Sequence, residues 1–212
     1  MATDSPITFI KQSFKDFRTT GAIAPSSLFL ARAIAKTLPE QISDDFKVVE
    51  VGPGTGSVTG ELVKRMNGRG HLDLWEISPE FCKVLRSRIS REPVLAGMKN
   101  RINVYEGDIR SHNPGQYYDA VVSGLPFNCF QPEEVRGFIE HFRALLKPQG
   151  TLTWFEYVAI RKIQSPFVSK ARRAQLKGIN DVTSSFIRDH QFKQEIIPIN
   201  FPPARVRQLK FG

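Results

Sequence analysis

The chain has 212 residues, of which 41% are apolar and 24% are charged, and these values predict one folded α/β domain rather than a disordered chain. No apolar run is long enough to span a bilayer, no secretory signal opens the chain, and the two cysteines, Cys82 and Cys129, cannot form a disulfide framework, so we expect a cytoplasmic protein. The net charge of +9 predicts an anionic partner, either nucleic acid or an acidic membrane surface.

The first segment, residues 1–19, is predicted to be an amphipathic helix that begins at Ser5-Pro6 and precedes a domain over residues 20–212. Its apolar face is formed by Ile7, Ile10, Phe14 and Phe17. Its basic flank is formed by Lys11, Lys15 and Arg18. Such a helix can lie in a membrane interface. Packing of the same face on its own domain would explain the pattern equally well.

A second helix is predicted from Leu28 to Leu38, and the next segment is the most informative in the chain. Lys47–Val51 is an apolar, β-branched run that predicts a buried strand, and from Ser57 the apolar spacing becomes helical. Between them lie Gly52, Gly54 and Gly56, a turn that we call the glycine corner. Because glycine has no Cβ, the backbone can turn sharply there and a nucleotide can lie against it.

Further strands follow at regular intervals. They are predicted at His71–Glu76, Arg101–Glu106, Tyr118–Ser123, Thr151–Tyr157, Glu195–Asn200 and Arg205–Phe211, and the last two form a closing antiparallel pair. Helices are predicted after Ser78-Pro79 and over Pro132–Leu146. Glu76 ends the second strand, where a carboxylate can accept hydrogen bonds from both ribose hydroxyls of a nucleoside.

Residues 161–177 combine six basic residues with interleaved apolar ones and contain no acid. This composition suits an anionic lipid surface or an RNA backbone. A solvated helix would also explain it.

The acidic residue Glu50, the glycine corner and Glu76, twenty residues after Gly56, together resemble motif I of the class I S-adenosylmethionine-dependent methyltransferases. The resemblance implies a Rossmann-like, doubly wound sheet of seven strands with the last one antiparallel. It also implies that S-adenosylmethionine binds here and leaves as S-adenosylhomocysteine, with Asp108 at the adenine amino group and Ile109 on the ring. The cofactor residues implied are Glu50, Gly52, Gly54, Gly56, Glu76, Ile77, Asp108, Ile109 and Ser123; no metal is expected.

Two methyltransferase families share the loop after the fourth strand, Ser123 to Asn128. In the rRNA adenine dimethyltransferases an asparagine precedes Leu-Pro-Phe and accepts from the target base, but Gly124 stands at that place here. The chain also ends straight after the predicted sheet, so we expect no helical RNA-binding domain and no nucleic-acid partner. The rRNA or nucleic-acid adenine N6-methyltransferases therefore remain an alternative only.

The chain is more similar to the soluble bacterial phospholipid N-methyltransferases. The resemblance covers nearly the whole chain and is carried by the basic amphipathic N-terminus, Gly21–Ser27 (GAIAPSS), VEVGPGTG, Ser123–Pro126 (SGLP) and the Pro202-Pro203-Ala204-x-Val206 terminus. It implies methylation of phosphatidylethanolamine toward phosphatidylcholine by a monomer attached peripherally to the inner face of the membrane. Another aminolipid, such as ornithine lipid, is an open alternative, and a non-catalytic cofactor-binding protein is a third hypothesis that the intact site residues disfavour.

For this reaction we expect the acceptor to meet Gly124, Leu125 and Pro126, and the membrane to meet Ile10, Lys11, Phe14, Lys15, Phe17 and Arg18. Methylated ammonium groups bind aromatic faces, so Phe127, Trp154 and Tyr157 are candidates for a cage, although core packing explains Trp154 at least as well. A dedicated general base is not required by the chemistry, because burial beside a cation lowers the pKa of an amine. If one exists, Glu156 and Tyr157 are the candidates.

Overall fold

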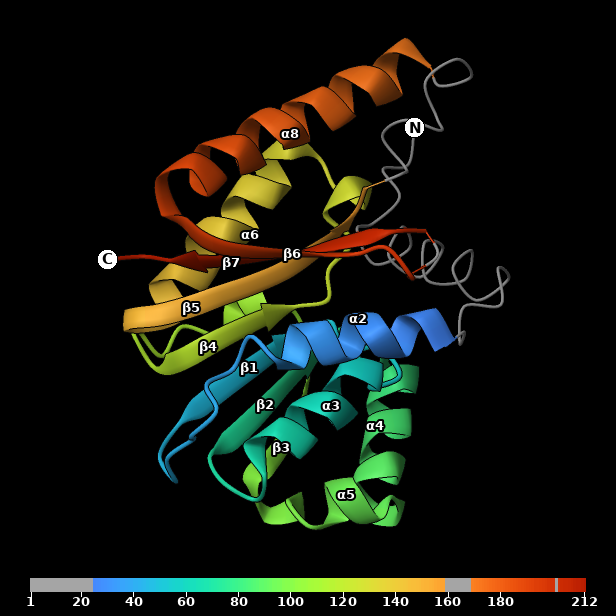
Figure 1. Ribbon diagram of the computed structural model, residues 1–212, viewed down its shortest axis with the longest axis vertical. Helices are drawn as coiled ribbons and strands as arrows, with labels where there is room; N and C mark the ends of the chain where they lie inside the picture. Colours follow the sequence, from blue (N-terminus) through green and yellow to red (C-terminus); the bar gives the residue numbers. More distant parts are fainter. Residues whose placement is uncertain (1–24, 159–168, 201) are drawn as a thin grey trace.

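The computed structural model describes residues 25–158, 169–200 and 202–212, which build one mixed sheet flanked by helices (Figure 1). The sheet has seven strands in the order β3-β2-β1-β4-β5-β7-β6. They are β1 (Lys47–Val51), β2 (His71–Glu76), β3 (Ile102–Glu106), β4 (Tyr118–Ser123), β5 (Leu146–Tyr157), β6 (Gln191–Ile197) and β7 (Ala204–Lys210). β1 to β5 pair in parallel, whereas β7 is antiparallel to β5 and to β6. The predicted doubly wound sheet with an antiparallel last strand is confirmed.

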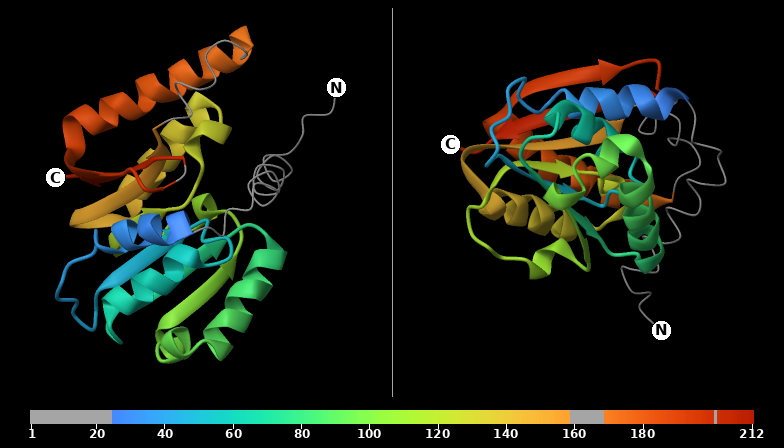
Figure 2. Two further views of the ribbon diagram at one scale, coloured as in Figure 1. Left: turned by 45° about the vertical axis from the view of Figure 1, so that its right-hand side comes forward. Right: turned by 90° about the horizontal axis from the view of Figure 1, so that it is seen from below.

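Helices cover both faces of the sheet, and the strand alternation sends side chains to two separate cores. On one side lie α2 (Pro25–Ala35), α3 (Ser57–Met66), α4 (Pro79–Arg91) and α5 (Pro93–Ala96), and on the other lie α6 (Pro132–Leu145) and α8 (Lys170–His190). Short 3-10 turns complete the chain at η1 (Lys99–Arg101), η2 (Ile109–Ser111) and η3 (Phe127–Cys129). Figure 2 shows α2 and α6 on opposite sides of the sheet. Val48 packs in the first core and Val49 in the second, as expected for a strand buried on both faces.

Local capping explains why several helix boundaries agree with the sequence prediction. Ser78 accepts a hydrogen bond from the Phe81 backbone N–H at 3.4 Å, and Pro79 occupies the first turn of α4. At the start of α6 the Glu134 carboxylate accepts from the Gln131 backbone N–H at 2.9 Å. These interactions depend on neighbouring residues alone, so sequence spacing is sufficient to locate them.

The carboxyl-terminal part differs from the prediction in two ways. α8 continues to His190, well beyond the basic–apolar segment, and β6 runs from Gln191 to Ile197 rather than from Glu195 to Asn200. β6 is one of the two edge strands, and five successive residues in it, 192–196, are exposed. An edge strand that is exposed on both faces lacks the alternation from which strands are predicted.

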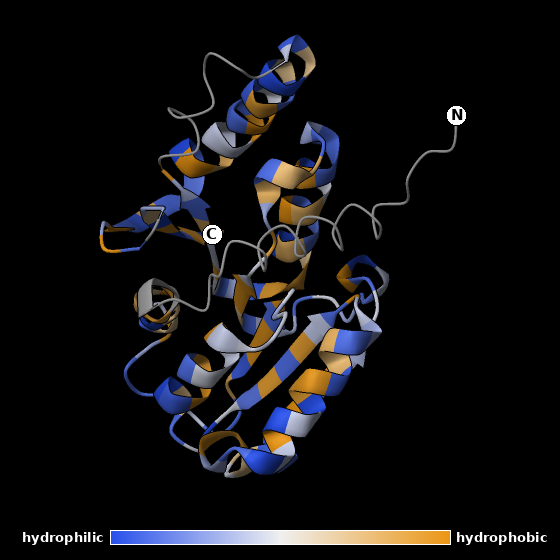
Figure 3. Ribbon diagram, turned by 90° about the vertical axis from the view of Figure 1, so that its right-hand side faces the viewer, coloured by the Kyte–Doolittle hydropathy of each residue, from blue (hydrophilic) through white to orange (hydrophobic). Residues whose placement is uncertain are grey.

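The carboxyl ends of the parallel strands and the start of α8 lie on one side of the molecule, which Figure 3 faces. α8 is held close to α6: a Cβ built at Gly178 would lie 2.6 Å from Pro132 Cγ. No helix in the described part of the chain is long and apolar enough to cross a bilayer. The predicted interfacial helix over residues 1–19, with all its membrane residues, and residues 161–168 lie outside the described ranges.

Candidate active site

The glycine corner is a backbone structure that strongly favours glycine. Gly52, Gly54 and Gly56 have φ values of 70°, 58° and 84°, in the left-handed region that side chains disfavour. Gly52 donates its backbone N–H to Trp75 O at 2.8 Å, and the Gly124 N–H donates to Val51 O at 2.8 Å. The corner is thereby joined to the ends of both neighbouring strands.

Gly124 is required where the β4 loop meets the corner. A Cβ at Gly124 would lie 2.6 Å from the Gly52 carbonyl oxygen, and a Cβ at Gly52 would lie 2.9 Å from Leu125 Cδ2. Ser123 is buried, and its Oγ accepts from the Leu125 N–H at 3.3 Å. Ser123, Gly124 and Leu125 therefore support the corner from the β4 side, and Pro126 is the first residue of the loop that reaches the pocket described below.

Glu76 is 1% exposed and lies directly beside the corner. One carboxylate oxygen, Oε2, accepts from the Gly54 N–H at 2.9 Å, and Oε1 accepts from the Ser78 N–H at 2.9 Å. Burial raises the pKa of Glu76 even though these backbone hydrogen bonds lower it. Each carboxylate oxygen can accept a second hydrogen bond, so Glu76 retains the acceptors that two ribose hydroxyls need.

Glu50 lies behind the corner, on the side of α3. It is 1% exposed, and its Oε2 accepts from Thr59 Oγ1 at 2.7 Å. Burial, offset in part by this hydrogen bond and reinforced by the charge of Glu76, raises the pKa of Glu50 to about 7. Its hydrogen bond therefore goes to α3, the helix that follows the glycine corner.

Asp108 and its neighbours follow β3, as predicted, and each is already bound within the protein. The Asp108 carboxylate accepts from the Arg110 backbone N–H at 2.9 Å and pairs with the Arg110 guanidinium at 2.5 Å. Burial would raise the pKa of Asp108, but these hydrogen bonds outweigh it and the pKa is lowered. Ile109 is 2% exposed in the second core, and Ile77 packs against the same core.

A pocket of about 430 Å³ lies beside the loop after β4, between the end of β5 and α8. Its wall is aromatic and apolar at Phe127 and Trp154, whose ring centroids are 5.8 Å apart. Polar and basic groups also line it: Asn128, Glu156, Asn180, Thr183, Arg173 and Lys177. Trp154 is only 1% exposed, so it belongs mainly to the core and contributes an edge to the pocket.

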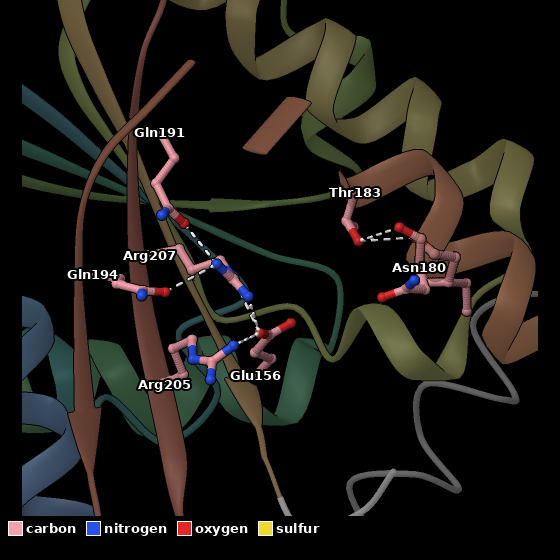
Figure 4. Close-up of polar contacts among 8 residues, drawn as sticks. Glu156, Asn180, Thr183, Gln191, Gln194, Arg205 and Arg207 are labelled. Carbon is pink, nitrogen blue, oxygen red and sulfur yellow. Dashed lines mark hydrogen bonds and ion pairs between the residues drawn. The ribbon is translucent and has the colours of Figure 1, made fainter. Parts of the chain in front are cut away.

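Glu156 belongs to an ion network that the sequence analysis missed. Its Oε1 accepts from Arg207 Nη2 at 2.6 Å and Nε at 2.9 Å, and Arg205 Nη1 lies 3.5 Å away (Figure 4). Arg207 also donates from Nη1 to Gln191 Oε1 at 2.6 Å and to Gln194 Oε1 at 3.2 Å. The spacing of Arg205 and Arg207 in β7 was the available signal in the sequence, but their partners come from two other strands, β5 and β6.

Tyr157, the other candidate base, lines the pocket and packs on Phe155 with ring centroids 5.5 Å apart. Burial raises the pKa of its phenol above the usual range. The phenol therefore keeps its proton at neutral pH and can donate a hydrogen bond. Of the predicted acceptor-side residues, the structure brings Pro126, Phe127, Trp154, Glu156 and Tyr157 together around one pocket.

This geometry agrees with comparisons to known proteins. Residues 48–150 match the family model described as a methyltransferase domain. The chain is 31% identical over 151 residues to an ornithine lipid N-methyltransferase from Singulisphaera acidiphila, covering 68% of this chain and 73% of that protein. It is 29% identical over 131 residues to a ribosomal RNA small subunit methyltransferase A from Borreliella burgdorferi, covering 58% of this chain and 42% of that protein.

Among solved structures, the O-methyltransferase TomG from Streptomyces achromogenes, in complex with S-adenosylmethionine, superposes with a TM-score of 0.65 at 13% identity. That match covers 100% of this chain and 92% of TomG, and it concerns the fold. The chain belongs to the class I S-adenosylmethionine-dependent methyltransferases. It is an enzyme of that class, and its cofactor is S-adenosylmethionine.

The residues present fit this cofactor. The glycine corner carries no side chain at Gly52, Gly54 or Gly56, so a nucleoside can lie directly against its backbone. Glu76 supplies the buried carboxylate beside it. These groups would hold the nucleoside.

Proposed function

We propose that this methyltransferase transfers methyl groups to the amine head group of a membrane lipid, phosphatidylethanolamine in the first place. The observation that carries the proposal is the pocket between the end of β5 and α8, which the loop after β4 also lines at Pro126, Phe127 and Asn128. It joins an aromatic wall at Phe127 and Trp154 to the basic side chains of Arg173 and Lys177. A lipid that has an amine and an anion in one head group matches both parts. Ornithine lipid is the second candidate, because the relative from Singulisphaera acidiphila methylates that class by name.

When bound at the corner, S-adenosylmethionine supplies a methyl group on a positively charged sulfur, which an amine nitrogen can take by in-line displacement with release of S-adenosylhomocysteine. The protein's task is to hold the amine in line and to keep it deprotonated before attack. The guanidinium of Arg173 and the ammonium of Lys177 line the pocket and disfavour a further positive charge there, and so does the apolar wall. Arg205 and Arg207 offset the negative charge of Glu156, which would otherwise favour a protonated amine.

Neither candidate base is well placed to remove the amine proton. The Glu156 carboxylate is paired with two guanidiniums, and the Tyr157 phenol keeps its own proton. We therefore assign deprotonation to the lowered pKa of the buried amine, with the proton leaving to solvent. Glu156 then serves as a hydrogen-bond acceptor, and the Phe127 ring is the aromatic surface for the more cationic, methylated products.

Access to a lipid requires attachment to the membrane surface. Large apolar side chains are exposed at the start of α2 and in the β6–β7 hairpin: Leu28, Phe29, Ile196 and Ile199. Both elements reach the side of the molecule that Figure 3 faces, where the start of α8 adds basic residues. Together with the predicted helix over residues 1–19, they support peripheral binding to an anionic bilayer, to which each basic residue adds about 1 kcal/mol.

Adenine N6-methylation of RNA is the competing function, supported by the ribosomal RNA methyltransferase relatives. The geometry at Gly124 disfavours it. Because a Cβ there would lie 2.6 Å from the Gly52 carbonyl oxygen, the base-binding asparagine cannot replace Gly124 without moving the corner.

The test is methyl transfer from labelled S-adenosylmethionine to separate substrates. Vesicles of anionic lipid containing phosphatidylethanolamine, the same vesicles containing ornithine lipid, and total RNA are incubated with the full chain. We expect label in the amine lipid, and a Glu76→Ala variant gives the background. Label in RNA alone would overturn the proposal. Deletion of residues 1–19 should reduce vesicle binding and turnover together; unchanged values would refute a membrane role for that segment.

A further inference from the structure

One face of α8 lines the pocket between β5 and α8, and its side chains change from basic to uncharged polar along the helix. Arg173, Lys177, Asn180 and Thr183 follow each other at spacings of three or four, so they share one face of the helix. This face begins with two basic residues and ends with an amide and a hydroxyl. Because an α-helix rises about 1.5 Å per residue, Lys177 and Asn180 are about 5 Å apart along the axis.

The inner end of this helix face is turned toward the ion network. In Figure 4 the second carboxylate oxygen of Glu156 points toward Asn180 and Thr183, while Oε1 holds Arg207 and Arg205 on the opposite side. The Thr183 hydroxyl is fixed by donating to the Ile179 backbone oxygen at 2.9 Å. The polar inner wall is therefore set by backbone and ion-pair contacts before any ligand binds.

The outer end is positioned just as closely. Gly178 lies between Lys177 and Ile179 and packs against Pro132, where a Cβ would come within 2.6 Å of Pro132 Cγ. Gln175 on the adjoining face donates from Nε2 to the Phe130 backbone oxygen at 2.6 Å. These contacts hold this part of α8 against Phe130 and Pro132, which follow the loop after β4. Because that loop carries Phe127, Arg173 and Lys177 keep a defined position relative to the aromatic wall.

We propose that Arg173 and Lys177 bind the anionic group of the acceptor's head group while Glu156 accepts a hydrogen bond from its amine, so that the pocket selects head groups in which a short linker joins amine and anion. This inference rests on the proposed lipid N-methylation. The phosphate of phosphatidylethanolamine and the carboxylate of ornithine lipid offer the same chemistry: an anion that guanidinium and ammonium groups bind. Arg207 is a positioning residue, because it acts through Glu156.

The test compares amine lipids whose head groups carry a phosphate, a carboxylate or no anion. Phosphatidylethanolamine, ornithine lipid and oleylamine, which has no anion, are presented in nonionic detergent micelles, where long-range attraction to a charged bilayer is absent. We expect the double variant Arg173→Gln/Lys177→Gln to raise the KM for the first two lipids at least about tenfold and to leave the KM for oleylamine unchanged. The affinity for S-adenosylhomocysteine, measured by calorimetry, should not change.

Lys170→Gln is the matched control, because Lys170 is an exposed lysine of the same helix that does not line the pocket. It should leave all three KM values unchanged. Glu156→Gln tests the other end: kcat should fall for all three lipids, including oleylamine, with thermal unfolding checking that the variant folds. Glycerophosphoethanolamine gives a second readout, and its dissociation constant should rise in the double variant and stay unchanged in Lys170→Gln.

Equal losses for Lys170→Gln and the double variant, or a KM for oleylamine that rises with the others, would overturn this inference and leave lipid methylation standing. A wild-type chain that binds S-adenosylhomocysteine but methylates none of the three lipids would overturn the proposed function itself.

Discussion

The cofactor-binding side of this enzyme, here called the donor side, and the proposed acceptor side are built by different means. Around β1, β2 and β4 the donor side consists of backbone: glycines with left-handed φ values, their N–H groups and one buried carboxylate, Glu76. Around β5, β7 and α8 the acceptor side consists of side chains, and its central pair, Glu156 and Arg207, is separated by 51 residues. A cofactor shared by a whole class needs one backbone shape, whereas acceptor recognition can change through side chains on a constant frame.

The two carboxylates Glu50 and Glu156 show the same contrast in electrostatic terms. Glu50 is fully buried, and in the described part of the chain it has the Thr59 hydroxyl as a partner but no ion pair. Glu156 is partly exposed and is paired with two arginines. The donor side therefore contains a buried carboxyl group without an ion pair in the described part of the chain. On the acceptor side the negative charge of Glu156 is balanced by Arg205 and Arg207. Each can be tested separately.

The largest loss of stability is expected from removing the ion pair between Arg207 and Glu156 on the acceptor side. Arg207→Met leaves Glu156 without its closest partner. Because Arg207 is buried and Glu156 is mostly buried, the loss should lower the free energy of unfolding by about 2 kcal/mol, less than for a fully buried pair. Urea unfolding at pH 7 measures it. Arg205→Met is the control, because Arg205 lies 3.5 Å from Glu156 and is more exposed, so it should cost less than about 1 kcal/mol. Equal costs would show that Arg207 is not the central partner.

The donor side should respond to pH instead. The pKa of Glu50 is about 7 in the folded protein against 4.5 for an unperturbed glutamate, so the folded state binds more protons between these values. The stability that Glu50 contributes is complete below pH 4.5 and is lost as the pH rises through 7. Relative to wild type, Glu50→Gln should remove a pH-dependent loss on the order of 3 kcal/mol between pH 5 and pH 8. Parallel curves of melting temperature against pH for the two proteins would contradict this.

Adding a single methyl group should be enough to disturb the backbone of the donor side. Gly124→Ala places a Cβ 2.6 Å from the Gly52 carbonyl oxygen and should cost about 2 kcal/mol, together with a loss of affinity for S-adenosylhomocysteine. Gly137→Ala, in α6, has no atom within 4 Å of its added Cβ and should be neutral or stabilising. Calorimetric titration and thermal unfolding of both variants measure the difference. Tight binding by Gly124→Ala would show that the corner tolerates movement.

The smallest effect is expected from a change of one oxygen at Glu76. Glu76→Gln leaves one acceptor oxygen where two backbone N–H groups now bind, so the affinity for S-adenosylhomocysteine should fall about tenfold, or about 1.4 kcal/mol. The KM for lipid should not change. Glu106→Gln is the control, because Glu106 is paired in register with Glu76 on β3 and is exposed. A shift in lipid KM would mean that the two sides are not separable.

The sequence alone determined the donor side because its elements are local. The boundaries of β1, β2 and β4 and the starts of α4 and α6 agree with the prediction, since alternation and capping depend on adjacent residues. The glycine corner and Glu76 were predicted to meet, and Glu76 Oε2 accepts from the Gly54 N–H at 2.9 Å. Strand order then brings Gly124 to the same place.

Only the tertiary structure decided the acceptor side. That Glu156 faces Arg207 follows from the pairing of β5 with β7, and that Arg173 and Lys177 face the same pocket follows from the packing of Gly178 on Pro132. It also placed Glu50 behind the corner, bonded to Thr59. Contacts between residues far apart in the chain depend on strand register and helix packing, which no local pattern encodes.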